Sequence, residues 1–206
     1  FAMEYLTLQN RRSEGDVISD DQFITARDKH VVIIGGGDTG ADCLGTSHRQ
    51  GARSVTQLEL MPRPPAERAP DNPWPQWPNV FRMSPAHEEG GERVYAVSTQ
   101  RFTGDSEGRV RALQAVKVEA LRANGRVKFN PIPESEFEIP ADLVLLAMGF
   151  VGPERSSLVT DLGITLTERG NAWRDQHWMT SVPGVFTAGD MQRGQSLIVW
   201  AIAEGR

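Results

Sequence analysis

Cysteine is almost absent from this chain, whose 206 residues include only Cys43. A single cysteine excludes an internal disulfide and any cysteine-rich metal or iron–sulfur site within the sequence. Because Cys43 falls inside an expected helix, we interpret it as a small packing residue rather than a redox group. The lack of disulfides is typical of a cytoplasmic protein, which is the localisation we expect.

Basic stripes and long apolar runs are also missing. The 22 Lys and Arg residues are spread along the chain and the net charge is −5, so we expect no nucleic-acid partner. No apolar run is long enough to cross a bilayer, so we expect no membrane partner. The remaining composition, 39% hydrophobic and 24% charged, is that of a globular protein of one or two domains.

The sequence lacks an initiating methionine and a recognisable signal peptide. It begins at Phe1 and stops at Arg206, directly after an apolar segment that favours a helix. We therefore interpret the chain as a fragment of a longer polypeptide.

A glycine-rich turn is the strongest functional signal in the chain. A run of β-branched residues ends in Gly35-x-Gly37-x-x-Gly40, and a helix-compatible segment follows. This pattern predicts a tight turn, a close backbone approach to phosphate and a helix N-terminus whose N–H groups favour an anion. The alternative is a glycine-rich turn of some other α/β domain. The expected dinucleotide-binding residues are Gly35, Gly36, Gly37, Asp38, Thr39 and Gly40.

The flanking segments predict a β-α-β unit with strands at 31–34 and 54–60 and a helix at 38–50 closed by Gly51. Glu59 falls near the end of the second strand, where a carboxylate can accept hydrogen bonds from a ribose diol, as in NADH. It points the other way if the register differs by one residue. Arg63 and Arg68 lie just beyond and can bind the 2′-phosphate of NADPH. The geometry leans to NADH, and both coenzymes stay open.

A proline-rich segment follows at residues 61–92. Its prolines exclude a regular helix or a central strand, so we expect a long ordered loop. Trp74, Trp77 and Phe81 indicate that the loop packs aromatic side chains on a core. The two tryptophans can alternatively cover a nicotinamide or form a subunit contact.

Hydrophobic periodicity predicts the remaining elements. Helices are expected near the two ends, at 1–12 and 195–204, with a polar connector at 13–28. Apolar–polar alternation predicts one strand at 94–102, a turn at 104–108, and an antiparallel ribbon at 110–121 and 126–129. A buried strand is expected at 141–149, a shorter β region at 162–167, and a turn with a strand at 182–190.

A second cluster lies near the C-terminus, where Gly189 and Asp190 end an expected strand and Gln195 and Ser196 open a helix. A carboxylate at a strand end can reach a sugar hydroxyl, and the helix N-terminus can stabilise negative charge. The alternative is an aspartate that only caps a helix. The four histidines show no catalytic or metal-ligand spacing, so we expect packing or surface roles, no catalytic side chain and no metal site: His30, His48, His87 and His177.

Several of these motifs resemble known flavoproteins. Residues 143–149 and 187–190 look like the late motifs of disulfide-reductase-like enzymes, in which an NAD(P)H domain is inserted within an FAD domain. Nearly the whole chain resembles the small (β) subunit of glutamate synthase. The similar segments are 32–43, the Pro-Trp run at 72–78, 141–152 and 189–202.

This resemblance implies an α/β fold: a Rossmann-like NAD(P)H-binding domain with a parallel sheet and an antiparallel β ribbon, plus the C-terminal piece of an FAD-binding domain. The implied boundaries are 1–24 for an FAD-domain or connector segment, 25–148 for the NAD(P)H domain and 149–206 for the incomplete FAD domain. Gly35, Gly37 and Gly40 are implied to bind the nicotinamide dinucleotide. The residues implied on the flavin side are Gly189, Asp190, Gln195 and Ser196, and Gly149 is a further expected cofactor-binding residue.

The implied activity is oxidation of NADH or NADPH with hydride transfer to FAD. Electrons then pass through iron–sulfur clusters to the glutamate synthase large (α) subunit, where glutamate forms. The family's first FAD-binding motif and its cluster cysteines lie upstream of this sequence, so FAD binding is expected to need the missing segment, and this fragment alone is expected to be inactive. Two alternatives stay open: a non-catalytic dinucleotide-binding or assembly module, and the NAD(P)H module of another ferredoxin-linked flavoprotein.

Overall fold

The computed structural model describes residues 1–73, 79–123, 126–155 and 157–206, which form two compact units. Unit 1 runs from Phe1 to Met148 and unit 2 from Gly149 to Arg206. Trp74 and Trp77 lie outside the described residues, so their expected roles stay predictions. The assignment of NAD(P)H and FAD domains also stays a prediction, because the division into units says nothing of ligands.

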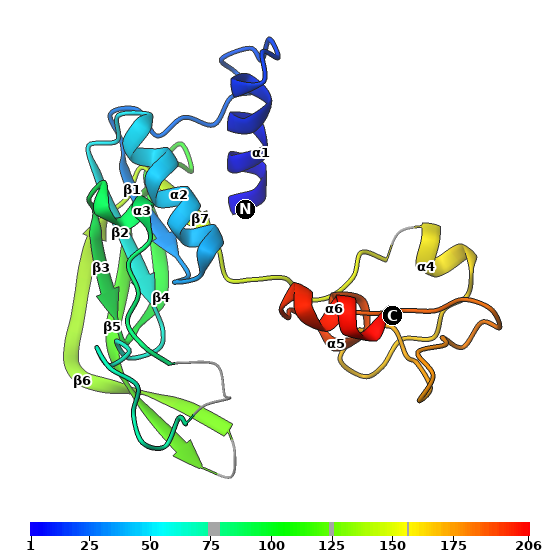
Figure 1. Ribbon diagram of the computed structural model, residues 1–206. Coiled ribbons are helices and arrows are strands. Elements are labelled where there is room, and N and C mark those ends of the chain that lie inside the picture. The colour runs from blue at the N-terminus through cyan, green and yellow to red at the C-terminus, as the bar shows by residue number, and fades with distance from the viewer. Residues whose placement is uncertain (74–78, 124–125, 156) are drawn as a thin grey trace. The chain divides into compact units, whose positions relative to one another are not determined.

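Unit 1 is built on a four-stranded parallel sheet in the order β3-β2-β1-β7 (Figure 1). Its strands are β1 His30–Ile34, β2 Ser54–Glu59, β3 Glu92–Tyr95 and β7 Leu143–Leu146. Helix α2, Asp38–Arg49, connects β1 to β2, and Gly51 adopts a φ of +83° just past its C-terminus. The predicted β-α-β unit and the buried strand near residue 145 are therefore confirmed.

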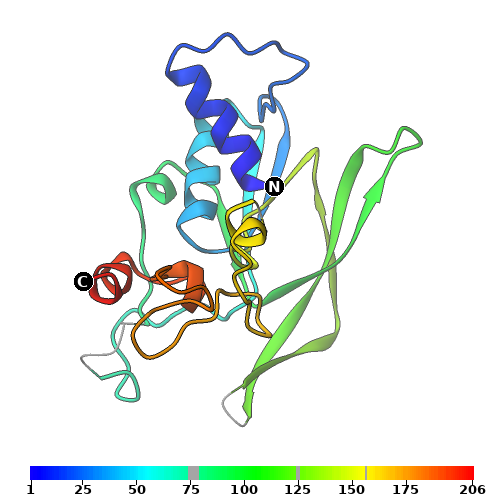
Figure 2. The ribbon, with the colours of Figure 1, turned by 90° about the vertical axis from the view of Figure 1, so that its right-hand side faces the viewer.

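The central strand β1 is buried on both faces of this sheet. Val31 and Ile33 pack against the helical layer, whereas Val32 packs against the antiparallel layer. The helical layer consists of α2 and α1, Ala2–Ser13, which lie side by side (Figure 2). Unit 1 is thus three layers deep, and its apolar core holds the carboxyl ends of the parallel strands in place.

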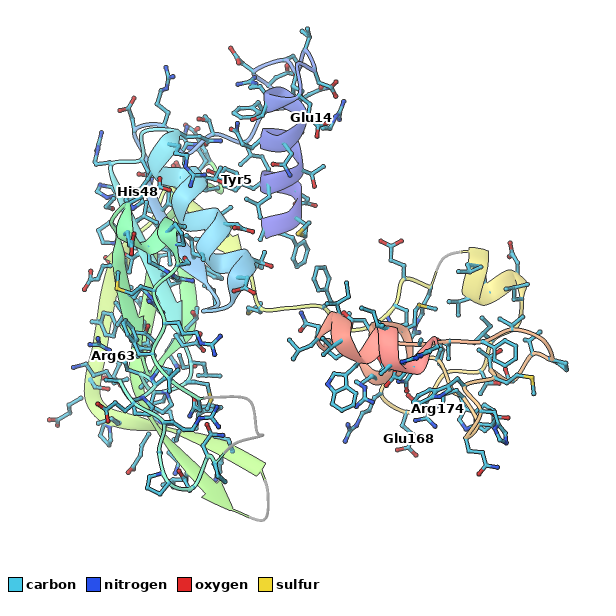
Figure 3. All side chains as sticks on the ribbon, in the orientation of Figure 1. Tyr5, Glu14, His48, Arg63, Glu168 and Arg174 are labelled. Carbon is cyan, nitrogen blue, oxygen red and sulfur yellow. The ribbon has the colours of Figure 1, made fainter. Side chains whose placement is uncertain are left out.

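Helix α1 is fastened to α2 by Tyr5, which lies between them (Figure 3). Its hydroxyl lies 3.3 Å from Ser47 Oγ and donates to Gln50 Oε1 at 3.0 Å. Burial raises the pKa of Tyr5 to about 12, so the hydroxyl keeps its proton. The helix expected at 1–12 is confirmed, and it belongs to the core of unit 1.

The antiparallel layer has the order β4-β5-β6, with β4 Val97–Gly104, β5 Val110–Ala123 and β6 Arg126–Pro140. The predicted ribbon is confirmed, and β6 continues well past residue 129 (Figure 2). The single strand predicted at 94–102 is wrong. Ala96 has a φ of +55° and separates β3 from β4, which pair in different sheets.

The proline-rich segment contains one turn of helix, α3 Pro85–Glu88, so the prediction that 61–92 has no regular helix is wrong at this point. Ser84 is the N-cap and Pro85 occupies the first turn, where proline loses no intrahelical hydrogen bond. The Phe81 ring meets the half-buried Tyr95 ring edge-on, with centroids 6.5 Å apart.

The described residues of unit 2 form three short helices, α4 Ser157–Asp161, α5 Asp190–Arg193 and α6 Ile198–Glu204. Its small core is formed by Val159, Ile164 and Ala172. In the described chain, the shorter β region expected at 162–167 and the turn with a strand expected at 182–190 form only isolated bridges, Leu166 to Ala172 and Met179 to Phe186. The helix expected at 195–204 is present in shorter form.

Cys43 is expected to be chemically inert in the folded protein. Its side chain is 0% exposed, and burial, with a smaller contribution from Asp42, raises the pKa of the thiol to about 12. The packing interpretation is therefore confirmed. A disulfide reagent such as DTNB should modify Cys43 only after denaturant is added; fast labelling of the native chain would contradict this assignment.

None of the helices in the described part of the chain is long and apolar enough to cross a membrane.

Candidate functional site: the glycine turn and the Gly189–Ser196 loop

The turn after β1 depends on Gly35. This residue has a φ of +127°, and a Cβ there would overlap the carbonyl of Ala147 at the end of β7. Its N–H donates to the carbonyl of Leu58 on β2 at 2.9 Å. The first glycine of the motif is therefore required by the fold itself.

Gly37 is different, because nothing in the chain requires a glycine at this position. It is the N-cap of α2 with φ −81° and ψ −173°, which any residue adopts. Among the described residues, apart from its immediate neighbours in sequence and the backbone of its own helix, no atom lies within 4 Å of the place where a Cβ would stand, and Gly37 is exposed. The glycine leaves open the space in front of the first N–H groups of α2, where an anion is stabilised.

Glu59, the last residue of β2, points toward this turn. A Cβ on Gly36 would overlap the Glu59 carboxylate, whose Oε1 also accepts the N–H of Met61 at 3.3 Å. The register alternative, with Glu59 turned away, is thus wrong for this fold. The carboxylate and the helix N-terminus lie next to each other, as recognition of a ribose and its pyrophosphate requires.

The two arginines after β2 have local partners. The guanidinium of Arg63, labelled in Figure 3, stacks on the Phe81 ring at 4.3 Å from its centroid. Arg93 contacts the same ring at 4.9 Å. Arg68 donates to the carbonyl of Asn72 at 3.3 Å. Their expected role in binding a 2′-phosphate stays a prediction.

In unit 2 the structure brings the predicted flavin-side residues together. Asp190 Oδ1 accepts the backbone N–H of Ser196 at 3.1 Å and its hydroxyl at 2.9 Å. The Gln195 amide lies against Gly149, where a Cβ would overlap it. Gly189 has a φ of +60° and packs on Ala201 of α6. Asp190 thus fixes the loop before α6 through Ser196, and neither α5 nor α6 has a side-chain hydrogen bond at its N-cap.

One buried residue that contacts this loop, Glu204 at the end of α6, was missed by the sequence analysis. The Glu204 side chain is 3% exposed and accepts the N–H of Gly189 and the Gln192 amide, each at 2.7 Å. It also forms an ion pair with Arg193. Burial alone raises the pKa of Glu204, but the hydrogen bonds from Arg193, Gly189 and Gln192 outweigh it and lower the pKa below 4.5. The spacing between residues 193 and 204 carries no local signal of this contact.

The histidines are dispersed, and no group of three metal-binding side chains occurs among the residues that the structure describes. His30 Nδ1 lies 2.7 Å from Ser54 Oγ, and His177 is exposed. His87 is more than a surface residue, because it bonds Ser84 and the buried Gln57. The N-cap serine followed by Pro85 was the available signal for the helix that carries it.

A family model described as pyridine nucleotide-disulphide oxidoreductase matches residues 97–205, more than half of the sequence. The chain belongs to this family. Within it, the chain is 62% identical over 208 residues to the glutamate synthase [NADPH] small chain of Mycobacterium tuberculosis, covering 100% of this chain and 42% of that protein. The resemblance inferred from the motifs is thereby confirmed.

Two further comparisons agree with this placement. The chain is 45% identical over 214 residues to glutamate synthase [NADH] of Schizosaccharomyces pombe, covering 100% of this chain and 10% of that protein. The crystal structure of T. acidophilum thioredoxin reductase superposes with a TM-score of 0.56 and 25% identity, over 87% of this chain and 50% of that one. The predicted α/β fold class is confirmed. The chain spans well under half the length of the glutamate synthases to which it is similar.

Proposed function

We propose that this chain is the pyridine-nucleotide-binding part of a glutamate synthase small subunit. In that role it positions NAD(P)H for hydride transfer to FAD, and electrons continue to the large subunit for glutamate formation. The observation that carries the proposal is Gly37, an N-cap glycine that neither backbone conformation nor packing demands. An approaching ligand explains it, because only a residue without a side chain lets phosphate oxygens reach the N–H groups of α2.

In this proposal, different residues of unit 1 bind different parts of the dinucleotide. The N-terminus of α2 faces the pyrophosphate, with its partial positive charge and unpaired N–H groups. Glu59 accepts hydrogen bonds from the ribose hydroxyls. Asp38, the first residue of α2, is exposed and Thr39 is half-buried, so we place both at the border of the site. No general base is needed, because hydride transfer depends on alignment of the two rings.

The loop of unit 2 forms the flavin side of the proposal. FAD, when bound, supplies the ring that accepts the hydride. Asp190, held by Ser196, and the Gln195 amide on Gly149 are the polar groups that we assign to its ribityl and ring edge. Glu204 does not contact the ligand in this assignment; it holds Gly189 and Arg193 in place.

Glu59 predicts a preference for NADH. A carboxylate beside the ribose repels a 2′-phosphate, so NADH should bind about tenfold or more tightly than NADPH. Glu59→Ala should weaken NADH and strengthen NADPH, whereas Glu67→Ala, in the exposed loop, should change neither. Titrations followed by tryptophan fluorescence measure both affinities. Tighter NADPH binding by the unmodified chain would assign the site to Arg63 and Arg68 instead.

A further inference from the structure

Gln57 is a buried amide in the middle of β2 that contacts the glycine turn directly. Its side chain is 2% exposed, and its Nε2 donates to the carbonyl of Gly35 at 2.8 Å. The same nitrogen lies where a Cβ on Gly40 would stand. Since the N–H of Gly35 already donates to Leu58, both polar groups of this glycine are held by β2.

The other end of the Gln57 amide faces α3. Its Oε1 lies 3.0 Å from His87 Nε2, while His87 Nδ1 receives the backbone N–H of Ser84 at 3.2 Å. Because a backbone N–H can only donate, Nδ1 is an acceptor and the neutral ring carries its proton on Nε2. Hydrogen bonds therefore run in one direction, from Ser84 to His87, to Gln57 and to the Gly35 carbonyl.

We propose that Gln57 and His87 are positioning residues for the dinucleotide, which hold the Gly35 carbonyl and thereby the conformation of the turn that faces the pyrophosphate. The inference rests on the proposed function of this turn. An apolar side chain would fill the core at residue 57 equally well, since Val55, on the same face of β2, packs into the apolar core beneath α2. The amide adds a directional bond to a single ligand-facing peptide.

This chain of hydrogen bonds from Ser84 to the Gly35 carbonyl depends on a neutral His87. Burial, and then the positive charge of Arg93 on β3, lower the pKa of His87 below 6.5. Protonation turns Nδ1 into a donor that opposes the Ser84 N–H. The chain of hydrogen bonds is therefore intact at neutral pH and is lost as the pH falls below the ordinary range of histidine pKa values.

Other charged or titratable side chains lie on or beside α3. Arg49 of α2 forms an ion pair with Glu89, the residue that follows α3. Glu88 is on α3 itself, and His48 of α2 faces Gly90 and Gly91. His48 is the titratable side chain that a control variant must separate from His87.

The test is calorimetric titration with ADP-ribose, whose pyrophosphate stays ionised between about pH 5.5 and about pH 7.5. We expect the unmodified chain to bind about fivefold more weakly at pH 5.5 than at pH 7.5, and Gln57→Met to weaken binding about tenfold at pH 7.5. His87→Gln cannot titrate, so it should bind with similar affinity at both pH values. His48→Gln and His177→Gln should retain the pH dependence. Circular dichroism checks that each variant is folded.

The outcomes separate the two proposals. If the unmodified chain binds ADP-ribose but Gln57→Met binds equally well, or His87→Gln keeps the full pH dependence, the positioning role is overturned and the proposed function stands. If the folded, unmodified chain does not bind ADP-ribose at either pH, the proposed function fails and the positioning role fails with it.

Discussion

Replacing Gly37 with tryptophan is expected to abolish dinucleotide binding while leaving the fold intact. The new side chain starts in open space, because its Cβ meets no atom of the described chain beyond its immediate neighbours in sequence and the backbone of its own helix. It does, however, cover the N–H groups at the start of α2, which the pyrophosphate needs. We expect the affinity for NADH to fall at least about a hundredfold. The affinity of the Gly37→Ala variant should lie between that of Gly37→Trp and that of the unmodified chain.

Gly35→Ala is the matched control for this experiment, because it lies two residues away and acts through the fold. It combines a φ of +127° with overlap of the Ala147 carbonyl. We expect the free energy of unfolding to decrease by about 2 kcal/mol or more. Chemical denaturation and NADH titration together separate the two effects. A Gly37→Trp chain that unfolds early, or one that still binds NADH normally, would contradict the assignment of Gly37.

Arg193→Met is expected to cause the largest loss of stability in unit 2. It removes the cation that pairs with the buried Glu204 and the guanidinium that lies 4.4 Å from the Trp200 ring centroid. A buried carboxylate without its cation is strongly unfavourable, so the thermal midpoint should fall by about 5 °C or more. Tryptophan fluorescence reports mainly on this unit, which contains three of the five tryptophans, Trp173, Trp178 and Trp200, whereas Trp74 and Trp77 belong to unit 1.

Arg11→Met is the matched control, since it removes an exposed pair with Asp16 and should leave the midpoint nearly unchanged.

The stability that Glu204 contributes depends on pH with a defined sign. Because the pKa of Glu204 is lowered in the folded state, its stabilisation is complete at neutral pH and is lost as the pH falls through that lowered value. Glu204→Gln should make the stability of unit 2 less dependent on pH at acidic pH. Equal midpoints for Arg193→Met and Arg11→Met would contradict the role of Glu204.

The parts of the fold that the sequence predicted are those with local causes. The strand, turn and helix around Gly35 depend on neighbouring residues, and apolar periodicity sufficed for them. The break at Ala96 has no such cause. Its N–H donates to Met61 and its carbonyl accepts from Val118, so distant segments stabilise a backbone that the alternating sequence conceals.

The same distinction applies to the candidate site. The glycines, Glu59 and Asp190 were predicted because their motifs are short and their spacing is known. Gln57 and His87, thirty residues apart, meet only because β2 and α3 pack together. Glu204 reaches Gly189 and Arg193 only when α6 folds back onto the loop. Polar side chains whose partners are distant in sequence leave no pattern from which to predict them.

The most direct test of the central claim is an equilibrium titration of this chain with NADH, with NADPH in parallel. Circular dichroism and a cooperative melt first establish that the chain is folded. We predict saturable binding at one site, tighter for NADH, that Gly37→Trp removes. A folded chain that binds neither coenzyme would contradict the assignment of the glycine turn as a dinucleotide site.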